Sequence, residues 1–381
     1  MLALIACFAA VQVQIDQPPR LRTVFSNGAS VLVEKAPASK SLILELLISS
    51  RGTEESPVTN GLRHLLEHLS ARGPKGELDA QVETAGGFLS ADTFRDAMRF
   101  KLSLPPGQLS FGLKVMEKLM QMPQVTPESI KLEADIIAQE AALAEDPAHL
   151  SAAAWTHAFG DQGADVIGND DVMRNATPEM LSKLHHSEFV GPNLALVVVG
   201  DVDLDATTTA CNALLSHAPG TVPVAKPRLK LQFGRTSARA DSQVVAVAAS
   251  GWRSPDTAAK VAAVFALSTV VEDSFVVYTP SSGYGLIQLG MPKDAPSLAS
   301  VVGKENKSEL FLLGREVARQ WVRSTLRTPS EVADSRGLLL VQQVDLKPET
   351  LLENLDTMSF QRFKEALEEF LSEKTITVVG K

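Results

Sequence analysis

The chain has 381 residues, of which 45% are apolar and 21% are charged, and its formal net charge is −9. This composition excludes a disordered or collagen-like chain, and the negative charge disfavours a nucleic-acid binder because no positive field meets the phosphates. Two cysteines are too few for a disulfide framework or a cysteine-rich zinc site, and the length predicts two or three domains.

The chain opens with an apolar run over residues 1–13, too short for the roughly 20 residues that span a bilayer. Its length matches the apolar part of a signal peptide, so we interpret residues 1–18 as a signal-like leader and expect export to the periplasm or cell envelope. The positively charged residues that usually precede the apolar part of a signal peptide are missing, since residues 2–13 contain no Lys or Arg. The alternative is therefore a first strand or a flexible N-terminus on a cytoplasmic protein. No other segment approaches membrane-spanning length.

The first half alternates strand and helix patterns. Asn27-Gly28 lies between two short strand patterns and is typical of a hairpin turn, because both residues tolerate positive φ. Thr126-Pro127 and Thr177-Pro178 are typical helix starts, each a Thr cap followed by Pro in the first turn. We predict strands at 21–25, 30–34, 41–50, 88–93, 97–104 and 194–199, and helices at 62–71, 78–85, 109–122, 126–144 and 177–189.

The second half repeats this pattern. We predict strands at 243–249, 286–290 and 375–379, and helices at 256–271, 308–324, from 328, and at 359–371. A helix followed by a valine-rich strand ends each half, and the two copies lie about 180 residues apart. This similarity predicts two related domains, 19–203 and 227–381, joined by a linker region at 204–226. Helix-to-strand units occur in any αβ protein, which is the alternative explanation.

His64 and His68 are four residues apart in a predicted helix, so both imidazoles lie on one face, one turn apart. This spacing suits two nitrogen ligands of a single Zn²⁺. Glu67 lies at the edge of the same face, within reach of a water molecule on that ion. The order H-x-x-E-H is that of the inverted zincins. Two chance histidines on an exposed helix are the alternative, which the four leucines within 62–69 disfavour.

A catalytic zinc usually has three protein ligands and one open position. The helix that starts at Thr126 offers Glu133 and Glu140, two turns apart on one face. Glu140 lies in an apolar stretch, where a carboxylate is costly unless it is paired or bound to a metal. For Glu133, a solvated charge on the helix surface is an equal alternative.

With these residues the chain resembles the pitrilysin-like and mitochondrial-processing-peptidase-like zinc metallopeptidases of peptidase family M16, in which a glutamate follows H-x-x-E-H further along. The resemblance extends from about Leu21 over nearly the whole chain. It also rests on Asn27-Gly28, Gly61-Leu62, Gly86-Gly87, Asp146-Pro147 and Gly200-Asp201. It implies an α+β fold of two homologous αβ domains, each a mostly antiparallel sheet with helices packed on one face, which form a clam-like half-chamber.

The resemblance also implies roles for the site residues. His64, His68 and Glu140 would bind one Zn²⁺ per chain. Glu67 would be the general base, and Glu133 would orient a ligand.

In that family the substrate, a peptide or an unfolded segment, lies extended along an edge strand. The matching segment here is 88–93, so the resemblance implies substrate contacts at Ser90, Ala91 and Asp92. The family usually has Asn at the position of Ser90, so we expect its substrate hydrogen bonds to differ. An ordinary internal strand is the alternative for this segment.

The second half departs from the family pattern. Active single-chain members also use an Arg and a Tyr from a stretch like R-x-x-x-G-L-A-Y. Residues 270–288 contain Tyr278 and Tyr284, but no Arg precedes them there, and the region is short. We therefore predict an abridged second domain and a paralogous partner chain in a heterodimer, or a homodimer.

The sequence thus predicts a zinc-dependent endopeptidase subunit. One alternative is a non-catalytic scaffold or core subunit that keeps the peptidase fold, which the missing Arg favours and the complete set of four site residues disfavours. Another is an exported two-lobed solute-binding protein, supported only by size and duplication. The acidic balance weakly favours neutral or basic peptides as substrates.

Overall fold

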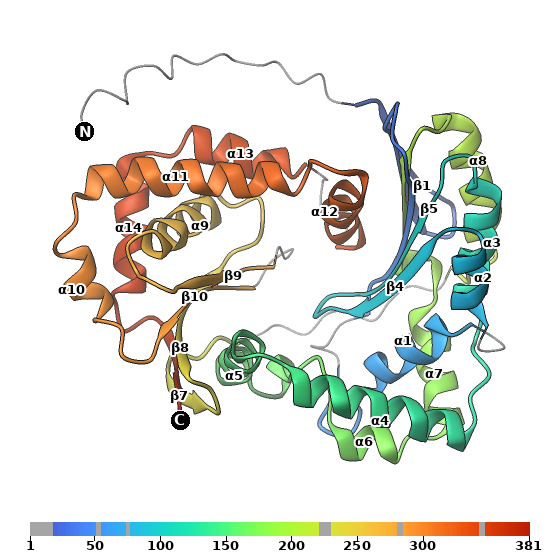
Figure 1. Ribbon diagram of the computed structural model, residues 1–381, viewed down its shortest axis with the longest axis horizontal. Helices are drawn as coiled ribbons and strands as arrows, with labels where there is room; N and C mark the ends of the chain where they lie inside the picture. The colour runs from blue at the N-terminus through green and yellow to red at the C-terminus, as the bar shows by residue number, and fades with distance from the viewer. Residues whose placement is uncertain (1–17, 51–54, 74–76, 221–229, 280–284, 343–346) are drawn as a thin grey trace.

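The computed structural model describes residues 18–50, 55–73, 77–220, 230–279, 285–342 and 347–381 (Figure 1). These residues form two αβ domains, each built on one sheet, which confirms the predicted α+β fold. The predicted leader at 1–18 lies outside the described residues except for its last position. No helix in the described part of the chain combines the length and the apolar character needed to cross a membrane.

The first half supplies a six-stranded sheet in the order β1-β2-β6-β3-β5-β4, in which only β2 and β6 run parallel. Its strands are β1 (Arg20–Val24), β2 (Ser30–Lys35), β3 (Leu42–Ile48), β4 (Phe88–Thr93), β5 (Met98–Leu104) and β6 (Leu194–Gly200). Its helices are α1 (Leu62–Ala71), α2 (Leu78–Thr84), α3 (Leu109–Met120), α4 (Pro127–Leu143), α5 (Asp146–Phe159), α6 (Asp170–Arg174), α7 (Pro178–Glu188) and α8 (Leu204–Leu215).

The second half supplies a five-stranded sheet in the order β7-β11-β8-β10-β9, in which only β7 and β11 run parallel. Its strands are β7 (Gly234–Ala238), β8 (Ser242–Ala249), β9 (Phe275–Val277), β10 (Gly285–Pro292) and β11 (Ile376–Gly380). Its helices are α9 (Pro255–Ser268), α10 (Leu298–Val302), α11 (Lys307–Ser324), α12 (Pro329–Val341), α13 (Glu349–Asp356) and α14 (Phe360–Phe370).

The opening hairpin forms at Asn27-Gly28, as predicted. Gly28 has a φ of +88°, which glycine adopts without steric cost, and β1 pairs with β2 from Val24 and Ser30 outward. The Asn27 side chain donates hydrogen bonds to the backbone oxygens of Leu215 and Ala218, at 2.8 and 3.1 Å. The turn therefore also holds the end of α8 against the first sheet.

Helix α8 lies in the stretch 204–226 that the sequence analysis assigns to a linker. Asp203 caps it by accepting a hydrogen bond from the backbone N–H of Ala206 at 2.8 Å. Its buried Cys211, Leu214 and Leu215 pack in the core beside β1 and β2. The first half is thus folded past residue 203. Most of this helix's apolar residues are small, since three are alanine and one is cysteine, so its sequence period is weak.

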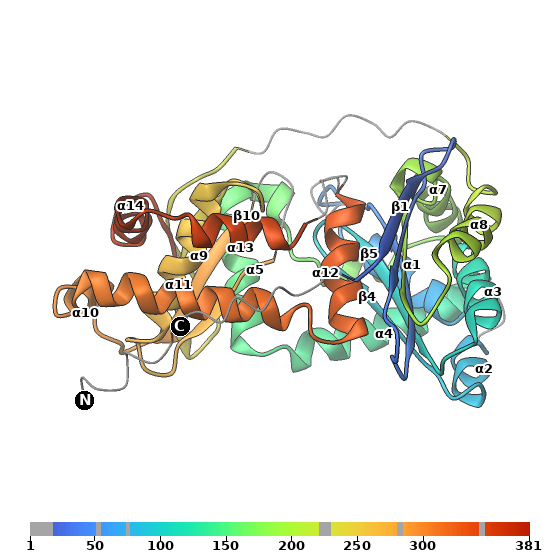
Figure 2. The ribbon, with the colours of Figure 1, turned by 90° about the horizontal axis from the view of Figure 1, so that it is seen from above.

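Each half contributes one helix that packs on the sheet of the other half. The apolar residues of β3 alternate between two cores: Leu44 and Leu46 pack with α1 and α3, whereas Ile43 and Leu47 face α12 from the second half. Helix α5 from the first half packs in turn on β7, β8 and β11 of the second sheet. Figures 1 and 2 both show α12 beside the first sheet. Each sheet is therefore covered on one face by a helix of the other half.

A buried carboxylic acid lies under α12. Glu45 in β3 is 0% exposed, and within the described residues neither of its carboxylate oxygens has a hydrogen-bond partner. Gly337 of α12 passes so close that a Cβ there would lie 2.9 Å from Glu45 Oε1. Burial first and the nearby Asp334 second raise the pKa of Glu45 to about 8, against the opposing charges of Arg99 and Lys101. Glu45 is therefore mainly protonated at neutral pH.

This acid should make stability depend on pH. A folded-state pKa above the unfolded value means that the folded chain holds the extra proton, so stability falls as the pH rises from about 4.5 to about 8. Glu45→Gln should raise the free energy of unfolding at pH 9 by up to about 5 kcal/mol, and should change it little at pH 5. Chemical denaturation at both pH values measures this, with exposed Glu128→Gln as the control. An equal change at both pH values would contradict the assignment.

Candidate metal centre

Helix α1 carries the H-x-x-E-H motif and begins and ends where the sequence predicts. It starts after Gly61, whose φ of +100° suits glycine and whose missing Cβ lets Gly168 approach, since a Cβ would lie 2.9 Å from Gly168 Cα. The four leucines at 62, 65, 66 and 69 are buried in the first core. The three polar residues of the motif therefore lie on the other side of the helix.

The structure brings His64, His68 and Glu140 together. The two Nε2 atoms are 3.2 Å apart, and Glu140 Oε2 on α4 lies 3.6 Å from His64 Nε2 and 3.5 Å from His68 Nε2. Ligand atoms of a tetrahedral Zn²⁺ with bonds of 2.0–2.1 Å lie about 3.3 Å apart. Two imidazole nitrogens and one carboxylate oxygen therefore fit a zinc ion, with the fourth position open.

Glu67 approaches the same atoms but is placed differently. Its Oε2 lies 3.9 Å from His64 Nε2 and accepts a hydrogen bond from Thr93 Oγ1 at 3.2 Å. Glu140 Oε2 lies nearer than Glu67 Oε2 to His64 Nε2, which favours Glu140 over Glu67 as a third ligand. Burial raises the pKa of Glu67 to about 8, against the opposing effect of His68. A cation bound beside it would favour its ionised form.

Each histidine is oriented by a partner at Nδ1. His64 Nδ1 lies 3.0 Å from the backbone oxygen of Ile167, and His68 Nδ1 lies 3.3 Å from Glu133 Oε2. Both Nε2 atoms are thereby turned towards Glu140, the pattern that ligand histidines show in metal sites. Burial lowers the pKa of His64. Burial opposes the charged form of His68 too, but the Glu133 hydrogen bond and nearby carboxylates outweigh it and raise its pKa.

Glu133 is held from its other side by Arg72, whose Nε forms an ion pair with Glu133 Oε1. Glu133 is only 2% exposed, so the alternative of a solvated surface charge does not fit. Glu140, seven residues further along α4, has a side chain that is 47% exposed. One face of α4 thus presents one buried carboxylate, that of Glu133, and one accessible carboxylate, that of Glu140.

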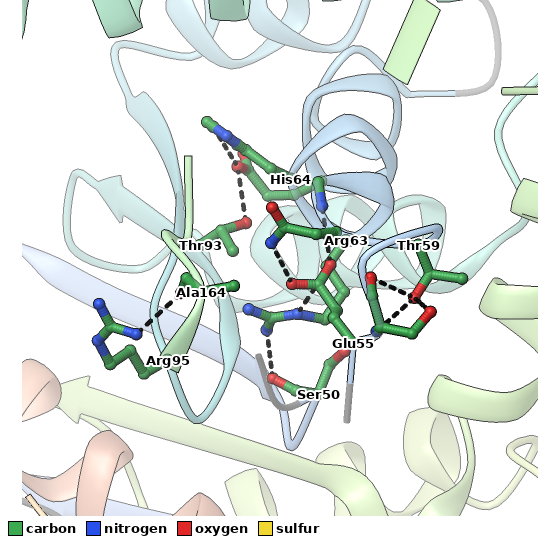
Figure 3. Close-up of polar contacts among 12 residues, drawn as sticks. Ser50, Glu55, Thr59, Arg63, His64, Thr93, Arg95 and Ala164 are labelled. Carbon is green, nitrogen blue, oxygen red and sulfur yellow. Dashed lines mark hydrogen bonds and ion pairs between the residues drawn. The ribbon is translucent and has the colours of Figure 1, made fainter. Parts of the chain in front are cut away.

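Arg63, next to His64, anchors the motif helix and was not singled out in the sequence. It is buried and donates hydrogen bonds to the backbone oxygens of Ser50 and Phe94, and it lies 3.6 Å from Glu55 Oε1 (Figure 3). Glu55 also accepts a hydrogen bond from the backbone N–H of Gly61 at 3.1 Å. A charged residue within an apolar helix needs polar partners, so Arg63 beside His64 was the sequence signal for this anchor.

Strand β4 contains the predicted substrate contacts Ser90, Ala91 and Asp92 and forms one edge of the first sheet. Its last residue, Thr93, bonds to Glu67 and so brings this strand to the motif helix. Sequence reasoning placed Thr93 in the strand without assigning it a role. Beside Thr93 is a cavity of about 320 Å³, lined by Trp155 of the first half and by residues of the second half that include Gln288.

The second half offers a tyrosine that is not free to reach this site. Tyr278 packs against Trp252 and Trp321, with ring centroids 6.3 and 6.1 Å away. Burial raises its pKa. Tyr284 lies outside the described residues.

Residues 30–162 match the model of the family described as insulinase (peptidase family M16). The chain is 22% identical to an uncharacterised zinc protease of Streptomyces coelicolor over 58% of this chain and 50% of that protein. It is 23% identical to the mitochondrial-processing peptidase subunit beta of Neurospora crassa over 53% of this chain and 44% of that protein. The chain spans about half the length of the curated relatives it matches.

A likeness in fold covers more of the chain. The crystal structure of a protease from Helicobacter pylori superposes with a TM-score of 0.81, at 16% identity, over 96% of this chain and 100% of that one. At this identity the match concerns the fold, and it includes both αβ domains.

Proposed function

Since residues 30–162 place the chain in the insulinase family, peptidase family M16, we propose that it is a zinc-dependent endopeptidase subunit. The observation that carries the proposal is the triangle of His64 Nε2, His68 Nε2 and Glu140 Oε2, with sides of 3.2 to 3.6 Å. These three residues would hold one Zn²⁺ per chain. Substrates would be peptides or unfolded protein segments.

When bound, Zn²⁺ supplies Lewis acidity to a scissile carbonyl group and to a water molecule. Glu67 acts as the general base: its carboxylate takes a proton from the attacking water and later gives it to the leaving amine. The Thr93 hydroxyl, 3.2 Å from Glu67 Oε2, fixes the orientation of that carboxylate. Because Glu67 is buried, bulk water does not compete for its hydrogen bonds.

The peptide would pair along the open edge of β4, where backbone hydrogen bonds require no particular side chain. Ser90, Ala91 and Asp92 would contact it, and Thr93 would bring its end to Glu67. A strand of this kind accepts extended segments and excludes folded ones, which supports unfolded segments as the substrate class.

A partner chain is the second part of the proposal. Residues 270–277 contain no Arg, and the ring of Tyr278 packs against Trp252 and Trp321, so the described residues of this stretch do not offer the Arg and Tyr that the family resemblance implies. We infer that a paralogous chain, or a second copy of this one, completes the substrate site. The apolar run at 1–13 supports export to the periplasm or cell envelope.

Metal analysis combined with a cleavage assay tests the proposal. The purified chain should contain one zinc ion and, alone or with its partner, should cleave an unfolded peptide. A chelator should abolish cleavage and added Zn²⁺ should restore it. A chain without zinc would overturn the peptidase proposal. Zinc without cleavage, with every partner tested, would favour the non-catalytic core subunit instead.

A further inference from the structure

Four charged side chains join the edge strand β4 to helix α12 of the second half, and we name them the Arg99 bridge: Asp92, Arg99, Lys101 and Asp334. Arg99 on β5 donates to Asp92 Oδ2 from Nη2 at 2.6 Å and from Nε at 3.1 Å. Its Nη1 donates to Asp334 Oδ1 on α12 at 2.5 Å. Lys101 Nζ donates to both Asp334 oxygens, at 2.9 and 3.0 Å. The bridge therefore spans both halves.

The sheet register holds these side chains in place. Asp92 pairs directly with Arg99, and Lys101 lies between Ser90 on β4 and Glu45 on β3. The Arg99 side chain is 11% exposed, and its guanidinium group lies 4.7 Å from the centre of the Phe94 ring. A planar guanidinium group can donate to two carboxylates at once, and partial burial makes such bonds stronger than those at an open surface.

Asp92 is the residue before Thr93, whose hydroxyl donates to Glu67. Any shift of β4 at Asp92 therefore also moves the next residue, Thr93, whose hydroxyl donates to the proposed base. A peptide paired with β4 would move with that strand. Helix α12 itself is fixed by its packing on β3 and β6.

We propose that Arg99 is a positioning residue that ties β4 to helix α12, so that the second half sets the place of a bound peptide relative to Glu67. This proposal deepens the proposed function and rests on it. It gives the second half a role in substrate binding that does not require a second-half Arg or Tyr. It also predicts that the bridge acts on both substrate pairing and the chemical step, because β4 would carry the peptide and provides the hydrogen-bond donor of Glu67.

Asp334→Asn tests the proposal, because Asp334 lies on α12, away from the reacting atoms. With zinc bound, this variant should lower kcat/KM for an unfolded peptide about tenfold, through a higher KM and a lower kcat, and should leave the zinc content within about twofold, as expected for loss of a charge-assisted hydrogen bond. Amide hydrogen exchange in β4 should become faster while that of α1 stays unchanged. Arg99→Gln should have the same effects. Arg99→Lys keeps the positive charge, so its effects should be smaller than those of Arg99→Gln.

Asp356→Asn is the matched control. Asp356 of α13 pairs with Arg319 Nη1 of α11 at 3.2 Å, so the same substitution breaks an ion pair inside the second half. The proposal is overturned if Asp334→Asn leaves both kcat/KM and β4 exchange unchanged, or changes them no more than Asp356→Asn does. If the zinc-loaded wild-type protein cleaves no peptide, the proposed function fails, and hydrogen exchange in β4 still decides whether the bridge holds the strand.

Discussion

Glu67→Gln is expected to reduce kcat for peptide cleavage by about 10²–10⁴-fold and to leave the zinc content at one ion per chain. Glutamine keeps the shape of the side chain and can still accept the hydrogen bond from Thr93 Oγ1, but it cannot take a proton from water. The metal stays because Glu67 Oε2 is 3.9 Å from His64 Nε2, whereas Glu140 Oε2 is closer to that atom, at 3.6 Å. Steady-state kinetics and metal analysis on one preparation measure both quantities.

Exposed Glu128→Gln, in the first turn of α4, is the control for a change of charge alone. If Glu67→Gln cleaved peptide at the wild-type rate, the hypothesis that Glu67 is the general base would be wrong. Loss of zinc in this variant would instead make Glu67 a ligand and reopen the role of Glu140.

Glu140→Gln is expected to abolish both zinc binding at micromolar zinc and peptide cleavage, because it removes one of the three proposed ligands. The side chain is 47% exposed, so the substitution should leave the unfolding temperature of the metal-free protein nearly unchanged. Glu133→Gln should behave differently. It keeps all three ligands but loses the carboxylate that orients His68, so zinc affinity should fall by about 10–100-fold without disappearing.

Competition with a chelator measures zinc affinity for both variants, and circular dichroism checks their fold. Equal losses in the two variants would contradict the division between ligand and orienting residue. If Glu140→Gln still bound zinc tightly, a residue other than Glu140 would be the third ligand.

Local signals predicted the motif helix well. The leucine spacing in 62–71 and the Gly before it define α1 to the residue, and a Thr-Pro start defines α4. That helix ends before Asp146-Pro147, as predicted, but no predicted helix includes these two residues. Pro147 instead stands in the first turn of α5, where its missing N–H costs nothing.

Long-range contacts could not be predicted in the same way. The bond from Thr93 to Glu67 spans 26 residues and the bond from Arg99 to Asp334 spans 235. No periodicity links such positions, because tertiary packing alone brings them together. The burial of Glu133, which the sequence left as an even choice, also depends on α1 packing against α4. The sequence thus proposed the candidate donors, and the packing supplies their mutual placement.

The exchange of helices between the sheets has a consequence during synthesis. A chain leaves the ribosome from its N-terminus, and domains usually fold in that order. Here one face of the first sheet is covered by α12, which lies far beyond β6, the last strand of that sheet, along the chain. The first half therefore receives this layer only after most of the second half has been synthesised. An incomplete nascent chain cannot yet form the Arg99 bridge that holds β4.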